Sequence, residues 1–150
     1  MTVNWEGFIA KANKTQAVLH SLPESARAHG KDALAILIDH SVPADQKLPK
    51  IEALFADQDA DTKVKIHKLA ERTVKFSVWM GQRLEHEDEE VKDAARKCAR
   101  SLLCKEFLAA SDSEKEAKLN DLVHSLNDKQ LEALKKFREE AKTKDAELDH

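Results

Sequence analysis

The sequence predicts an all-α protein, a compact bundle of about seven helices in one domain over residues 1–150. The composition favours helices, because the chain has only three Gly and three Pro, no Tyr, and only 5% aromatic residues. Apolar residues also recur with the 3.6-residue period of amphipathic helices. The length of 150 residues is that of one ordinary domain with a single substantial core.

The first two predicted helices precede residue 41. Apolar residues with helical spacing indicate a first helix over roughly residues 4–21. Ser21 and Glu24 then have the spacing of a capping box, which predicts the start of a second helix. Pro23 in its first turn costs no helical hydrogen bond, so we expect this helix to continue to about His40.

The third and fourth helices are predicted from proline and acidic residues. Pro43 opens a short third helix, and Pro49 inside it predicts a kink or a late start. The acidic run at residues 57–61 predicts the start of a fourth helix, because negative charge stabilises a helix N-terminus. We expect a break at Gly81, since one helix over residues 60–110 would be about 75 Å long, far longer than a compact domain allows.

The last three helices have clear start signals. The acidic run at residues 85–90 begins a fifth helix that is predicted to reach about residue 109. Ser111, with Glu three residues later, forms a capping box for the sixth helix. Asn127, with Gln three residues later, starts the seventh helix in the same way.

The chain contains a candidate internal duplication. A displacement of 71 residues brings apolar positions into register, for example Ile51 onto Leu122. This register predicts two related three-helix lobes, residues 22–80 and 87–148, with the first helix as an added brace. Chance is the alternative, because any two amphipathic helical hairpins can be aligned in apolar register. A seam between two lobes would be a common place for a ligand.

The charge pattern excludes two classes of partner. The chain has 25 Lys and Arg against 28 Asp and Glu, a net charge of −3. The charges are evenly spread, so we expect neither a nucleic acid nor a polybasic membrane contact.

We also expect no transmembrane segment, because no apolar run approaches the roughly 20 residues that span a bilayer. The N-terminus lacks the pattern of a signal peptide.

Metal and cofactor sites are not predicted. The run DQDAD at residues 57–61 imitates the start of a calcium loop, but Thr62 replaces the required Gly and Lys68 the required Glu. Helix capping is the favoured interpretation of this run. The carboxylates around His86 offer weak divalent binding, and a solvated helix start is the favoured interpretation there too.

An enzyme is not predicted either. Seven His residues occur without an HExxH motif, a paired Cys/His spacing or a Ser/His/Asp grouping. Cys98 and Cys104 lie six residues apart on a predicted helix, too far apart for a disulfide unless the helix breaks. We expect both to be free thiols, with Cys98 in the core and Cys104 partly exposed.

Two segments resemble a known family. Residues 33–66, which read ALAILIDHSVPADQKLPKIEALFADQDADTKVKI, resemble one half of the SXP/RAL family of nematode secreted antigens. Residues 107–148 are similar to the other half, so the halves stand in the opposite order here. The two-lobed plan also resembles the nematode polyprotein allergens, carriers of fatty acids and retinol, whose cysteines are farther apart in sequence than Cys98 and Cys104. The resemblance implies a secreted protein, whereas a native start at Met1 would imply a cytoplasmic one.

Together these observations predict a small non-enzymatic carrier for a fatty acid, a retinoid or a similar apolar ligand. The ligand tail would lie among the third, fourth, sixth and seventh helices, where each buried CH₂ contributes about 0.8 kcal/mol. The expected tail-binding residues are Leu54, Phe55, Phe76, Trp79, Leu126 and Phe137. Lys75 and Arg83 are expected at the rim, where they would bind the carboxylate.

The same aromatic residues would also fit a plain packed core. The alternative function is therefore a helical protein-interaction or structural module, or an antigen, without a small ligand. A closed internal cavity would favour the carrier, and an open apolar groove would favour the module. The carrier prediction fails if Phe76 and Trp79 are tightly packed with no adjoining cavity.

Overall fold

The computed structural model describes residues 2–149, which form helices and connecting turns without strands, as predicted. Seven helices of nine or more residues match the seven predicted ones, and two short segments, α2 and α7, are additional. The bounds are α1 (Glu6–His20), α2 (Glu24–Arg27), α3 (Gly30–Ile38), α4 (Ala44–Leu54), α5 (Ala60–Arg83), α6 (Glu89–Ser101), α7 (Lys105–Ala109), α8 (Asp112–Val123) and α9 (Asp128–Leu148).

The predicted second helix is divided, and its predicted capping box is wrong. Ser21 follows the end of α1, where its hydroxyl donates to the Val18 carbonyl. Pro23 precedes α2 and provides no side-chain cap. A turn beside Gly30 then separates α2 from α3, where glycine is a poor helix former. His29 in this turn packs edge-on against Phe55, so a distant contact holds the break in place.

The other predicted breaks also differ from the structure. Gly81 lies inside α5, which ends two residues later at Arg83 and tolerates a glycine at a cost of about 1 kcal/mol. Pro49 lies inside α4, which starts at Ala44 without delay. The fifth predicted helix divides at residues 102–104 into α6 and α7, and this turn lets Phe107 of α7 enter the core.

Three predicted helix starts are confirmed by their caps. Asp59 accepts a hydrogen bond from the backbone N–H of Thr62, so the acidic run is a helix start. Ser111 accepts one from the N–H three residues later. Asn127 and Gln130 form a complete reciprocal capping box. These bonds satisfy backbone donors that have no partner within the helix.

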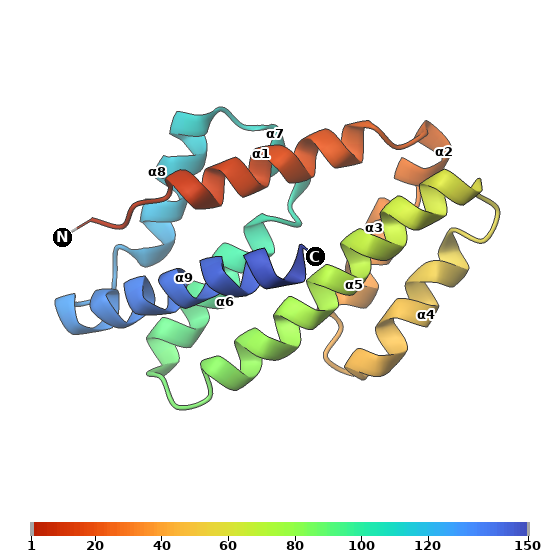
Figure 1. The fold of residues 1–150 in the computed structure, drawn as a ribbon. Helices are drawn as coiled ribbons and strands as arrows, with labels where there is room; N and C mark the ends of the chain where they lie inside the picture. Colours follow the sequence, from red (N-terminus) through yellow and green to blue (C-terminus); the bar gives the residue numbers. More distant parts are fainter. Residues whose placement is uncertain (1, 150) are drawn as a thin grey trace.

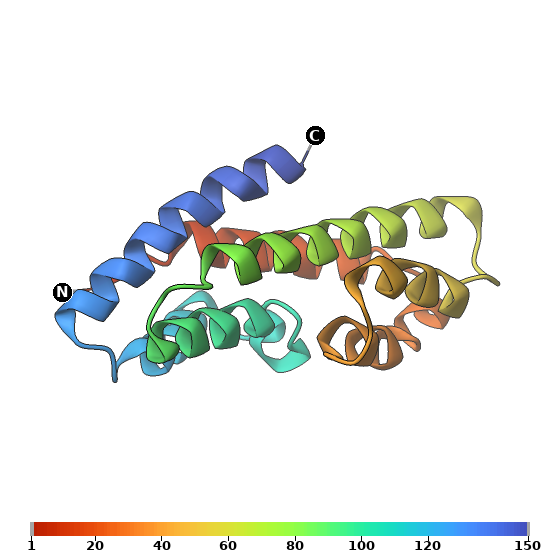
Figure 2. The ribbon, with the colours of Figure 1, turned by 90° about the horizontal axis from the view of Figure 1, so that it is seen from below.

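The helices form a layer of long elements with two groups of short ones on one side. Figure 2 shows the long helices α1, α5 and α9 in this layer. In Figure 1, α2, α3 and α4 lie beside the first half of α5, and α6, α7 and α8 lie at the opposite end. Helix α9 packs against both α5 and α6, and α1 packs against α7 and α8. No helix within residues 2–149 combines the length and apolar character needed to cross a bilayer.

The interior consists of two hydrophobic clusters rather than the expected single core. The larger core joins α1, α6, α7, α8 and α9 with the end of α5, and the smaller core joins α2, α4 and the first half of α5. Leu19 packs against both clusters. The smaller core is built from Leu22, Ala26, Ile51, Phe55, Ile66 and Ala70. The internal duplication of residues 22–80 and 87–148 stays a prediction.

Replacing Leu134 with Ala should lower the free energy of unfolding by about 2–5 kcal/mol, because its side chain is fully buried in the larger core. The matched control is Leu54→Ala, the same change at a partly buried position beside the smaller core, where we expect a smaller loss. Urea unfolding followed by circular dichroism measures both. Equal losses would contradict the assignment of the main core to α9 and its neighbours.

Candidate functional site

The predicted tail-binding residues do not meet in one place. Phe55 is buried in the smaller core, and Leu54 packs against that core. The others belong to the larger core or pack against it, namely Phe76, Trp79, Leu126 and Phe137. The structure therefore divides the predicted pocket between the two ends of α5.

The two cations predicted at the rim already have carboxylate partners. Lys75 is exposed and pairs with Glu71 at 2.8 Å between Nζ and Oε1. Arg83 pairs with Glu87 at 3.1 Å and with Glu140 at 2.5 Å. The charges of both side chains are thus compensated within the protein, and neither lines the cavity described next.

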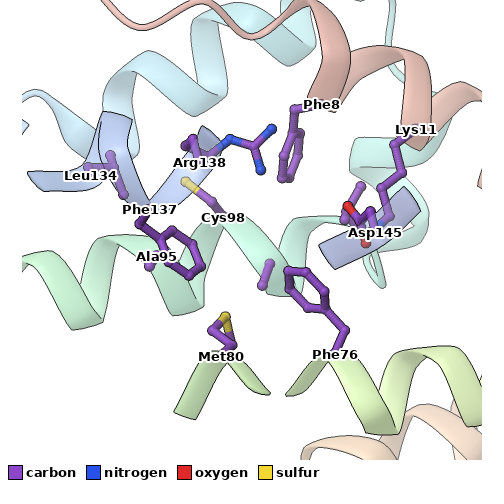
Figure 3. A pocket seen from close by; sticks show the side chains of 12 residues that line it. Phe8, Lys11, Phe76, Met80, Ala95, Cys98, Leu134, Phe137, Arg138 and Asp145 are labelled. Atoms are coloured by element: carbon purple, nitrogen blue, oxygen red, sulfur yellow. Dashed lines mark hydrogen bonds and ion pairs between the residues drawn. The ribbon is translucent and has the colours of Figure 1, made fainter. Parts of the chain in front are cut away.

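A small, partly open cavity adjoins two of the predicted residues, Phe76 and Phe137 (Figure 3). Trp79 lies behind this wall, where it stacks on Phe137 with ring centroids 5.7 Å apart. The cavity has a volume of about 20 Å³, enough for about one water molecule. Phe76 is therefore packed beside a cavity, although the cavity is too small in this conformation to hold an acyl chain.

Four helices, α1, α5, α6 and α9, meet around the cavity. Its wall is mostly apolar, with Phe8, Met80 and Leu134 beside the two phenylalanines already named. Figure 3 shows a charged end, where Lys11 of α1 faces Asp145 of α9. The cavity thus combines an apolar wall with a partly exposed ion pair, whose two side chains are 24% and 18% exposed.

An ion-pair network ties the end of α9 to α1 and α5. Lys11 Nζ lies 2.5 Å from Asp145 Oδ1. Arg72 Nη2 lies 3.6 Å from the same oxygen, and Arg72 Nη1 lies 2.7 Å from Asp149 Oδ1. Burial lowers the pKa of Lys11, while its hydrogen bond to Asp145 acts in the opposite direction.

Arg138 is the charged group of the cavity that this network leaves out. Its guanidinium carbon lies 4.8 Å from the centroid of the Phe8 ring, a cation–π contact. Within residues 2–149 its Nε is buried and has no hydrogen-bond partner. Burial lowers the pKa of Arg138, since the charged form has lost water and forms no ion pair with a residue of 2–149.

Sequence reasoning missed Arg138 and Asp145, although a signal was present. Both continue the spacing of three and four residues that Leu131, Leu134 and Ala141 follow along α9. Charged residues at such positions face the interior of a bundle. In a segment as highly charged as residues 135–147, this spacing is easily overlooked.

A second hollow lies between α4 and α5 and is open to solvent. This α4–α5 groove has a volume of about 480 Å³, and its apolar floor contains Phe55 and Ile66. Val64, which is 51% exposed, adds to the apolar surface. Lys63 and Lys68 stand at the rim of the groove.

His67 connects the two helices that form this groove. Its Nδ1 bonds to Glu52 of α4, and its Nε2 lies 2.7 Å from Oε2 of Glu71 on α5. The hydrogen bond with Glu52 is the main cause that raises the pKa of His67. No group of three or more His, Cys, Asp or Glu side chains in the described chain is placed to hold a metal ion.

Replacing Glu52 with Gln should lower the pKa of His67 toward its ordinary value of 6.5, because the main stabilising hydrogen bond is lost. The raised pKa means that the His67–Glu52 pair stabilises the fold fully below pH 6.5. This stabilisation is lost as the pH rises through the pKa of the folded protein. NMR titration of the imidazole measures the shift, and an unchanged pKa in Glu52→Gln would contradict the contact.

The two cysteines are free, as predicted, and should differ in reactivity. Cys98 is 3% exposed, and burial raises its pKa to about 12, so it holds almost no thiolate at pH 8. Cys104 is partly exposed. Ellman's reagent should label one thiol rapidly in the native protein, and Cys104→Ser should remove that reaction. Rapid labelling of the native Cys104→Ser variant would contradict the burial of Cys98.

Comparison with known proteins identifies no relative. No family model matches the chain, and neither a curated protein nor a solved structure is significantly similar to it. The resemblance to the SXP/RAL family and to the polyprotein allergens therefore stays a prediction. The features that bear on the function of the protein are the cavity, the α4–α5 groove and the side chains around them.

Proposed function

We propose that this protein is a small non-enzymatic helical carrier of a fatty acid or a similar apolar ligand such as a retinoid. The observation that supports the proposal is the cavity among α1, α5, α6 and α9, with Phe76 and Phe137 in its wall. Its apolar wall suits a hydrocarbon tail, and its charged end suits a polar headgroup. This site contains two of the residues predicted from the sequence, Phe76 and Phe137, but not the predicted rim residues Lys75 and Arg83.

Binding requires the cavity to expand, because pockets for small ligands usually have volumes of about 300–1,000 Å³. The end of α9 beyond Ala141 is the part best placed to move, because none of residues 142–149 is buried. This end is held by ion pairs of Lys11 and Arg72, whose side chains are 24% and 23% exposed, and ion pairs near the surface contribute little stability. Met80 in the cavity wall is a flexible side chain that adapts to a changed volume.

The expanded site would gain free energy from the buried tail. At about 0.8 kcal/mol per CH₂, burial of a chain of sixteen carbons supplies about 12 kcal/mol toward the free-energy cost of opening the helices. Phe76 and Phe137 would then contact the ligand tail in place of the side chains that they now pack against. Trp79, stacked on Phe137, would report the change through its fluorescence.

A second candidate function is a helical protein-interaction module. The α4–α5 groove favours it, because the groove is open to solvent and includes the exposed Val64. An open groove with an apolar floor suits the apolar side chains of another protein. The ligand-binding experiment separates the two functions, since only the carrier requires the cavity among α1, α5, α6 and α9.

Titration with an environment-sensitive fluorescent fatty acid should give saturable binding near one equivalent, with a dissociation constant of about 1 μM or below. Oleate should displace the probe, and competition with retinol tests the retinoid class. Ala99→Phe fills the cavity from α6 and should weaken binding about tenfold or more. The control, Val64→Lys, changes only the α4–α5 groove and should leave binding intact.

Absence of binding up to tens of micromolar would reject the carrier and leave the interaction module as the better hypothesis. Loss of binding in Val64→Lys, with normal binding in Ala99→Phe, would place the ligand in the groove and reject the cavity as its site. Urea unfolding of each variant checks that the fold is retained.

A further inference from the structure

Arg138 is a partly exposed residue whose Nε is buried in the interior. It lies on the face of α9 that carries the buried side chains of Leu134 and Ala141. A buried cation normally has a carboxylate or several carbonyl groups as partners, because removing a charge from water is costly. Arg138 has neither in the described chain, although Phe8 covers one face of its guanidinium.

The neighbouring charges do not compensate Arg138. The cluster contains three cations, Lys11, Arg72 and Arg138, and two carboxylates, Asp145 and Asp149. Both carboxylates are engaged by Lys11 and Arg72. Asp145 attracts Arg138 only at longer range, and the adjacent Glu139 is exposed and acts more weakly still. The cluster is thus left with one positive charge.

The surroundings of Arg138 suit one negative group at the head of an apolar molecule. Figure 3 shows its guanidinium beside Phe8 and the thiol of Cys98, on the same side of the cavity as Leu134. A planar guanidinium binds a carboxylate through two parallel hydrogen bonds, using its edge while an aromatic ring covers its face. Apolar walls extend from this point toward Phe76 and Met80.

Building on the carrier function proposed above, we propose that Arg138 anchors the headgroup of the ligand and that the ligand is a monocarboxylate rather than a neutral lipid. The carboxylate supplies the single negative charge that the cluster lacks. The hydrocarbon tail then runs along the apolar wall between α5 and α9. A neutral alcohol or retinol would leave the guanidinium without a negatively charged partner.

The experiment compares oleate with oleyl alcohol, two ligands with the same chain and different headgroup charge. The native protein should bind oleate at least about tenfold more tightly, because hydrogen bonds between charged partners are the stronger kind. Arg138→Gln should weaken oleate binding to the level of the alcohol, so that the preference for oleate is lost. Arg96→Gln, at an exposed arginine of α6, is the matched control and should retain the preference.

Wild-type protein provides a second measurement that does not depend on a variant. The NMR signal of the Arg138 Nε–H group should shift when oleate is added and should not shift with oleyl alcohol. Equal binding of both ligands with no Arg138 shift would overturn the anchor while the carrier function stands. Failure of both ligands to bind would overturn the carrier function itself, and the anchor with it.

Discussion

The packing of α9 against α5 and α6 is the constraint on which the rest of the larger core depends. Leu131, Leu134, Phe137 and Ala141 are all buried along one face of this helix. Arg138 and Asp145 lie on this face as well, because residues three or four positions apart share one face of a helix whether they are apolar or charged. The cavity, the stacking on Trp79 and the ion-pair network all follow from this single placement.

Buried charge of this kind weakens a fold unless each group has a partner. Asp145 serves two cations at once, which ties the end of α9 to α1 and α5. Arg138 forms no such ion pair in the described chain, and an apolar side chain of similar volume would pack there at least as well. In the proposed carrier, the ligand is the missing partner of Arg138. The unpaired charge lowers the stability of the ligand-free protein, and the same charge makes the site selective for an anion.

The sequence-based site failed for a geometric reason. Helix α5 contains 24 residues and is about 36 Å long, so its two ends serve different cores. Phe55 lies near the start of α5 and Trp79 near its end, and neither the cavity nor the α4–α5 groove is lined by both. Periodicity identified these residues as buried, which is correct for Phe55 and Phe137, but periodicity carries no information about which buried residues share a space.

The sequence by itself determined the all-α class, the seven main helices, the caps at Asp59, Ser111 and Asn127, and the free thiols. These features depend on residues within about six positions of one another along the chain, so local patterns suffice to predict them. Only the tertiary structure decided the turns that separate α2 from α3 and α6 from α7, the division into two cores, and the isolation of Arg138. Those features depend on residues far apart, as in the pair of Lys11 and Asp145, which are separated by 134 positions.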